Sequence, residues 1–198
     1  VIELHHPNTV QFFDFGEMED RTLFIVMEYI DGQTIYDILQ DVKVMEEADA
    51  IRSTLQTAKA LDHSHARGFI HRDVKPKNIM INEDGEVKLA DMGLAREVSD
   101  YKTAESEQGR AYGTPYYISP EQIRGEINID FRADIYSLGA TLYHMLAGRV
   151  PFEGSTPSAV MHKHLKEELP PADHVNTNLS AGVGEIIEVM MAKKRDER

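Results

Sequence analysis

A predicted β-hairpin with polar residues at both ends is the feature that most limits how this chain can fold. The apolar runs 79–81 and 87–89 flank the turn-forming segment 82–85, which reads Asn-Glu-Asp-Gly, so we expect the two runs to pair as short antiparallel strands. Asn78 precedes the first strand and Asp91 follows the second. Because a tight hairpin brings its ends together, these two side chains can face one metal ion.

The segment that leads into this hairpin supplies further chemistry. Residues 71–78 read His-Arg-Asp-Val-Lys-Pro-Lys-Asn, and residues 91–93 read Asp-Met-Gly. Transfer of a γ-phosphoryl group requires a protein to hold Mg²⁺-ATP, to orient the acceptor hydroxyl and to offset charge in the transition state. Asp73 suits the hydroxyl, and Asn78 and Asp91 suit the metal. These residues therefore predict phosphoryl transfer.

The two motifs resemble the catalytic loop and the magnesium-binding loop of eukaryotic-type (Hanks-type) serine/threonine protein kinases, whose patterns are H-R-D-x-x-x-x-N and D-F-G. The resemblance covers nearly the whole chain and is bacterial in style. Its other blocks are a His-Pro-Asn segment, a strand and hinge, and an activation segment, at residues 6–8, 24–29 and 91–121. Met92 replaces the usual Phe, and we expect this flexible apolar side chain to be tolerated.

The resemblance implies an α+β, bilobal protein-kinase-like fold. Residues 1–30 would be a remnant of the N-lobe (family strands 4 and 5) and the hinge, and residues 31–198 a mostly helical C-lobe that is incomplete at its C-terminus. The family's glycine-rich loop, strand-3 Lys and helix-C Glu lie upstream of its His-Pro-Asn segment. We therefore expect a fragment, truncated at both ends, that alone binds ATP poorly and transfers phosphate slowly or not at all.

Sequence periodicity adds local expectations. The runs 9–15 and 21–29 are rich in β-formers and predict a second hairpin. Apolar spacing predicts helices over 33–40, 51–65 and 134–146, and Ser180 is expected to cap a last helix.

Catalytic roles follow from the resemblance. Asp73 would be the catalytic base, and Lys75 the positive charge on the γ-phosphate. Asn78 and Asp91 would hold Mg²⁺, with Mn²⁺ as a substitute. Thr114 is expected to contact both Asp73 and Lys75, and this pairing of Lys75 with Thr114 resembles kinases that phosphorylate serine or threonine.

Nucleotide binding is also implied by the resemblance. Met27 would be the gatekeeper, and the backbones of Glu28 and Ile30 would face adenine, whose edge offers one donor and one acceptor. Met80 would pack beneath the adenine ring. Lys75, Asn78 and Asp91 would complete the ATP site on its phosphate side.

The activation segment carries the expectations on regulation and structure. Thr103 and Ser106 are the candidate sites of self-phosphorylation, with Ser106 favoured. Glu121 and Arg198 are expected to form a buried ion pair that is structural rather than catalytic. Lys77 stands where relatives that select arginine often carry Glu, so we expect weak selection for arginine two residues before the acceptor.

Two other functional classes stay open. A pseudokinase that acts as a scaffold or regulatory module would need a defect in the upstream part. A small-molecule phosphotransferase of the same fold ranks last, because such enzymes generally lack the peptide-docking segment 113–121.

Composition excludes several partners and sites. The formal charge of −13 disfavours nucleic acid and anionic membranes, which Lys and Arg would have to grip. The chain has no cysteine, and its His-x-His pairs at 63–65 and 162–164 lack the acidic or thiolate companions of a metal site. No stretch is long and apolar enough to span a membrane. We expect a cytoplasmic location and protein substrates, although such kinases often continue into a membrane anchor.

Overall fold

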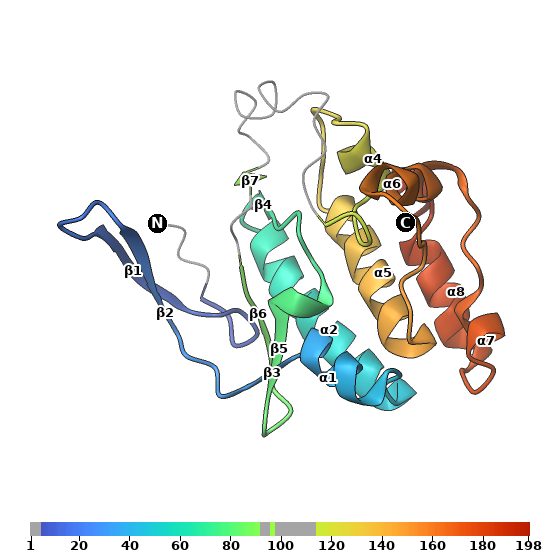
Figure 1. Ribbon diagram of the computed structural model, residues 1–198, viewed down its shortest axis with the longest axis horizontal. Coiled ribbons are helices and arrows are strands. Elements are labelled where there is room, and N and C mark those ends of the chain that lie inside the picture. The colour runs from blue at the N-terminus through green and yellow to red at the C-terminus, as the bar shows by residue number, and fades with distance from the viewer. Residues whose placement is uncertain (1–4, 92–95, 98–113) are drawn as a thin grey trace.

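The computed structural model describes residues 5–91, 96–97 and 114–198. Figure 1 shows a hairpin at one end, a small sheet in the middle and a group of helices at the other end. The hairpin consists of β1 (Phe12–Glu17) and β2 (Leu23–Met27). The small antiparallel sheet has the order β3-β5-β6, and its strands are β3 (Gly32–Thr34), β5 (Ile79–Asn82) and β6 (Val87–Leu89). A further pair joins β4 (Phe69–Ile70) to β7 (Arg96–Glu97).

The described helices follow the same order along the chain. They are α1 (Ile35–Val42), α2 (Glu47–His65), α4 (Pro120–Ile123), α5 (Arg132–Ala147), α6 (Pro157–Lys166), α7 (Ala172–Val175) and α8 (Ala181–Met190), with the 3₁₀ turns η1 (Pro76–Asn78) and η3 (Arg195–Glu197). The predicted α+β fold class is confirmed.

Helix α5 runs through the core, as its apolar sequence predicts. Tyr136, Tyr143 and Leu146 are fully buried. The helix ends at Gly148, whose φ of 69° lies in the left-handed region that glycine adopts without strain. A Cβ atom on Gly139 would lie 2.7 Å from Cβ of Met190, so α8 can approach α5 closely only because this residue is glycine.

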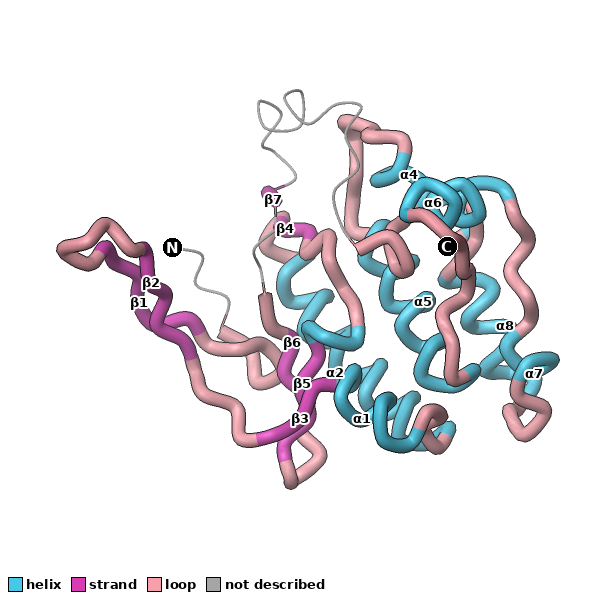
Figure 2. The backbone as a smooth tube through the Cα atoms, viewed as in Figure 1, coloured by secondary structure: helices cyan, strands magenta, loops and turns pink. Residues whose placement is uncertain are grey.

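The predicted hairpin at residues 9–29 is confirmed, and it reaches away from the helices (Figure 2). Many of its apolar side chains are solvent-exposed, and Leu23 is 77% exposed. The described residues therefore leave this small sheet largely uncovered.

Two local predictions need correction. The helix expected to begin at residue 33 begins at Ile35, because Gln33 pairs with Ile81 in the small sheet and Thr34 caps the helix. Ser180 does precede α8, but its side chain makes no capping bond to that helix. Its hydroxyl instead donates to Oε1 of Glu47 (2.6 Å), which ties the start of α8 to the start of α2.

Candidate active site

The loop that follows β4 is held from below by one buried carboxylate. The Oδ2 atom of Asp134, at the start of α5, accepts a hydrogen bond from the backbone N–H of His71, and its Oδ1 atom accepts one from Arg72, both at 2.8 Å. Nε2 of His65 also donates to Oδ2 at 2.8 Å. Asp134 is 0% exposed, so these bonds form in a low-dielectric interior where they are strong.

This anchoring matters because the backbone at Arg72 is strained. Its φ of 69° is in the left-handed region, which a bulky residue adopts at a cost of about 1–3 kcal/mol. Besides the bond to Asp134, the Arg72 carbonyl accepts a hydrogen bond from Nε2 of Gln122 at 2.8 Å. The fold therefore holds the residue before Asp73 in one conformation from two sides.

The side chain of Asp73 lies at the centre of a compact polar cluster. Its Oδ2 atom is 2.5 Å from Nζ of Lys75 and 3.3 Å from Nδ2 of Asn78. Its Oδ1 atom accepts a hydrogen bond from Oγ1 of Thr114 at 3.0 Å, and Nζ of Lys75 donates to the same Thr114 oxygen at 3.0 Å. The predicted contacts of Thr114 with Asp73 and Lys75 are confirmed.

The β5–β6 hairpin brings Asn78 and Asp91 close together, as its turn sequence predicts. The N–H of Ala90 donates to the carbonyl of Asn78 at 2.8 Å, and Asp91 is the next residue. Nδ2 of Asn78 donates to the backbone carbonyl of Asp73 at 2.9 Å, so the free atom of this amide for a cation is Oδ1. Nε2 of His71 donates to the Ala90 carbonyl at 3.1 Å, which fixes the loop before Asp91.

These donors fit a magnesium ion. Mg²⁺ prefers oxygen ligands and in proteins is usually held by one or two carboxylates together with phosphates and waters. An amide oxygen and a carboxylate on adjoining strand ends supply that kind of incomplete shell. Among the described residues no group of three or more His, Cys, Asp or Glu side chains could hold a metal ion.

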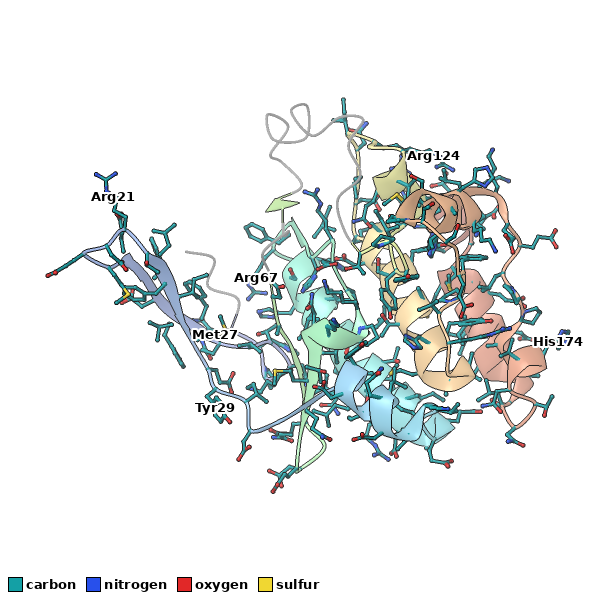
Figure 3. All side chains as sticks on the ribbon, in the orientation of Figure 1. Arg21, Met27, Tyr29, Arg67, Arg124 and His174 are labelled. Carbon is teal, nitrogen blue, oxygen red and sulfur yellow. The ribbon has the colours of Figure 1, made fainter. Side chains whose placement is uncertain are left out.

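The predicted hinge residues lie where β2 leaves the hairpin. Figure 3 labels Met27 at the end of β2 and Tyr29 beyond it, on the segment that leads to β3. The side chain of Glu28 is occupied: Oε1 accepts from Nζ of Lys88 (2.8 Å) and Oε2 from the backbone N–H of Gln11 (3.0 Å). Burial tends to raise the pKa of Glu28, but these bonds outweigh it and lower the pKa.

The backbone of this segment keeps hydrogen-bonding capacity. The N–H of Glu28 donates to the carbonyl of Gln11 at 2.7 Å. Within the described ranges, the Glu28 carbonyl and the Ile30 N–H have no hydrogen-bond partner. Met80, on β5, is partly exposed and pairs with Thr34 across the sheet.

The structural ion pair predicted from the sequence is confirmed. Nη1 and Nη2 of Arg198 donate to the two carboxylate oxygens of Glu121 at 2.6 and 2.9 Å. The two side chains are 0% and 3% exposed. The guanidinium also lies 4.8 Å from the ring centroid of Tyr136, so this pair joins α4, α5 and the end of the chain.

The histidine pairs have structural surroundings in the described part of the chain. His65 contacts Asp134, and Nδ1 of the buried His164 is 2.8 Å from the Tyr136 hydroxyl. His63 lies against His6, with ring centroids 5.0 Å apart. Both rings are surrounded by positive charge and partly buried, and burial is the larger cause that lowers the pKa of each.

Other predicted residues lie outside the described residues: Met92, Thr103, Ser106 and Gly113. The sequence reasoning also missed Asp134 as part of the site and treated it only as the first residue of a helix. The signal was present, because Asp134 is the one acidic residue at the start of an otherwise apolar run.

A carboxylate, a lysine and an amide on one anchored loop, beside an acid at the end of a hairpin, define a site of the phosphotransferase class. The chain matches the protein kinase domain family over residues 1–198. It therefore belongs to the protein kinase domain family.

Curated relatives agree with this assignment. The chain is 39% identical over 206 residues to the probable serine/threonine-protein kinase PknB of Bifidobacterium longum, covering 100% of this chain and 30% of the relative. It is 39% identical over 198 residues to serine/threonine-protein kinase PknB of Mycobacterium tuberculosis, with 98% and 32% covered. A probable serine/threonine-protein kinase of Clostridium perfringens is 38% identical over 193 residues, with 98% and 28% covered. The chain thus spans about a third of the length of these relatives.

The described part of the chain contains no helix that is both long enough and apolar enough to cross a membrane.

Proposed function

We propose that this chain carries the catalytic site of a kinase that transfers the γ-phosphoryl group of Mg²⁺-ATP to serine or threonine hydroxyls of proteins. The observation that supports this most directly is the cluster of Asp73, Lys75, Asn78 and Thr114 on the anchored loop. The relatives named as serine/threonine-protein kinases support the same acceptor class.

Asp73 is the proposed catalytic base. A carboxylate offers about four lone-pair sites, and three are used, one on Oδ1 by Thr114 and two on Oδ2 by Lys75 and Asn78. The remaining site, on Oδ1, can accept the proton of a substrate hydroxyl. Thr114 would then lie beside the acceptor, and its bond to Asp73 would keep the carboxylate turned toward it.

The residues around Asp73 divide the binding of Mg²⁺-ATP between them. Asn78, through Oδ1, and Asp91 would hold Mg²⁺, for which Mn²⁺ could substitute, and the ion would neutralise charge on the β- and γ-phosphates. Lys75 would place its ammonium on the γ-phosphate, and would leave its close contact with Asp73 only in part, because an ammonium has three donors. Each side chain is already held in position by the loop.

Adenine would bind beside the hinge. The Glu28 carbonyl and the Ile30 backbone could supply the acceptor and donor that its edge requires, with Met27 behind the ring and Met80 beneath it. The boundary between an N-lobe remnant at residues 1–30 and a C-lobe at residues 31–198 stays a prediction that accompanies this arrangement, as does a cytoplasmic location. Self-phosphorylation is proposed at Thr103 or Ser106.

The experiment is transfer of labelled phosphate from Mg²⁺-ATP by the full-length protein, with the modified residues mapped by mass spectrometry. The expected result is label on serine and threonine only, and loss of label in a Lys75→Met variant that remains folded. Label at Ser106 or Thr103 would support control through the activation segment. No transfer by a folded protein that binds nucleotide would contradict the proposal and favour a scaffold.

A further inference from the structure

The catalytic loop carries an exposed lysine that the proposed chemistry does not use. Lys77 lies in the 3₁₀ turn η1, between Lys75 and Asn78. Its side chain is exposed, and in the described part of the chain it makes no ion pair. Its Nζ atom lies 4.5 Å from the ring centroid of Tyr36 on α1, a contact that holds the ammonium at a defined place on the surface.

The ring of Tyr36 borders a second aromatic pair. The Tyr117 hydroxyl lies 2.8 Å from Nδ1 of His144, and the two rings are stacked at 6.1 Å. Burial raises the pKa of the Tyr117 phenol, and nearby Tyr36 adds to this, which puts the two tyrosines close together. Burial also lowers the pKa of His144, so its imidazole is neutral at pH 7. We call Tyr36, Lys77, Tyr117 and His144 the lysine–tyrosine patch.

The lysine–tyrosine patch lies next to the catalytic carboxylate. The N–H of Tyr117 donates to the carbonyl of Thr114 at 3.0 Å, and the Thr114 hydroxyl in turn donates to Asp73. On the other side, Lys77 belongs to the same loop as Asp73. A peptide whose hydroxyl reaches Asp73 must therefore pass close to the patch.

The charge of the patch is set by Lys77. The other three side chains are neutral at pH 7, and the neighbouring carboxylate, Asp37, is already engaged. Its Oδ2 atom accepts from both the N–H and the hydroxyl of Thr34, at 3.1 and 2.5 Å, in a capping box. An acidic group on a bound peptide would gain an ion pair with Lys77, and a basic group would be repelled.

We propose that the lysine–tyrosine patch is a specificity subsite that selects an acidic side chain near the acceptor residue of a protein substrate. This inference rests on the proposed kinase function and adds a substrate class to it. The chain's own candidate acceptor fits, since Ser106 stands between Glu105 and Glu107 in the sequence. The formal charge of −13 would by itself favour basic peptides, so a preference for acidic ones must come from a local cation.

The test separates binding from transfer. Peptides with Ala in place of the acceptor, and with Glu, Gln or Arg at each of the four preceding positions, are titrated against the full-length protein by fluorescence anisotropy. At one position the Glu peptide is expected to bind about threefold more tightly than the Gln peptide, the scale of an exposed ion pair. The Arg peptide should bind more weakly than either, and the differences should shrink as salt is added.

Variants identify the residue responsible. Lys77→Met should remove the preference for Glu over Gln, and Lys77→Glu should reverse it in favour of Arg. Lys166→Glu makes the same charge change at an exposed position of α6 and should leave the preference intact. Equal binding of Glu and Gln peptides at every position, or a preference that survives in Lys77→Met, would overturn the inference.

The failure of the proposed function would look different. Ser-containing versions of the same peptides are assayed in parallel for phosphate transfer from Mg²⁺-ATP. If these peptides receive no phosphate while the Lys77-dependent preference persists in binding, the kinase reaction is refuted and the subsite stands.

Discussion

Replacing Asp134 by Asn should destabilise the protein and disturb its site, although the residue does not touch the reacting atoms. The substitution keeps the shape of the side chain but exchanges one oxygen acceptor for an amide donor. In the native protein both oxygens are used, Oδ1 by the N–H of Arg72 and Oδ2 by the N–H of His71 and by His65. An asparagine can satisfy only one of these two sides.

The better orientation keeps the amide oxygen toward His71 and His65 and turns the NH₂ group toward Arg72. One charge-assisted hydrogen bond is then lost, worth about 1.5–3 kcal/mol, and a buried donor is left unsatisfied, which costs about 1–3 kcal/mol. The site is fully buried, so water cannot compensate. The expected loss in the free energy of unfolding is about 3–5 kcal/mol.

The unsatisfied N–H belongs to the residue with the strained backbone. Once its anchor is lost, Arg72 can leave the left-handed conformation recorded at φ 69°. Asp73 is the next residue and would shift with it. Because small displacements of reacting groups cost about 10²-fold in rate, the rate of phosphate transfer should fall by about that factor, with the affinity for nucleotide changing less.

Urea unfolding followed by circular dichroism measures the first effect, and steady-state transfer measures the second. Asp49→Asn is the matched control, since Asp49 is exposed and pairs with Arg52 on the surface of α2, and it should cost under about 1 kcal/mol. A loss below 1 kcal/mol in Asp134→Asn, or full transfer activity in that variant, would refute the reasoning.

Two further predictions concern stability. Arg198→Met should cost about 3–5 kcal/mol in urea unfolding, because it leaves the carboxylate of Glu121 buried and unpaired; the double variant with Glu121→Leu should regain most of this, and an additive double-mutant cycle would contradict it. Burial lowers the pKa of His164 to about 3 from 6.5, so the unfolded chain binds a proton that the folded protein does not, and stability should fall as pH drops from about 6.5 toward 3, by up to about 1.4 kcal/mol per pH unit. The pH dependence of unfolding should flatten in His164→Asn but not in His162→Asn, whose parent side chain is exposed, and equal slopes in the two variants would argue against His164.

Local structure was readable from the sequence where short-range rules decide it. The turn at 82–85 predicted the β5–β6 hairpin, and that hairpin brings Asn78 and Asp91 together through the Ala90 N–H. The core helix α5 was likewise evident from its apolar run and from Gly148 after it. Both signals act over a few residues, so they do not depend on the rest of the fold.

Long-range contacts were less accessible. Ser180 looked like a helix cap, but folding places Glu47 within 2.6 Å of its hydroxyl, and a carboxylate is the stronger acceptor. The role of Asp134 depends on a loop more than sixty positions away. Only the resemblance to a family predicted the pair of Glu121 and Arg198, since no local pattern links residues so far apart.

A single-turnover measurement tests the central proposal most directly. Phosphate transfer from Mg²⁺-ATP to a serine peptide is followed for the full-length protein, for Asp73→Asn and for Asp84→Asn, an exposed aspartate of the β5–β6 turn. If Asp73 is the catalytic base, Asp73→Asn should lower the rate by about 10²–10⁴-fold without loss of folding or of nucleotide binding, while Asp84→Asn stays near the wild-type rate. A folded Asp73→Asn protein that transfers phosphate within tenfold of the wild-type rate would contradict the account.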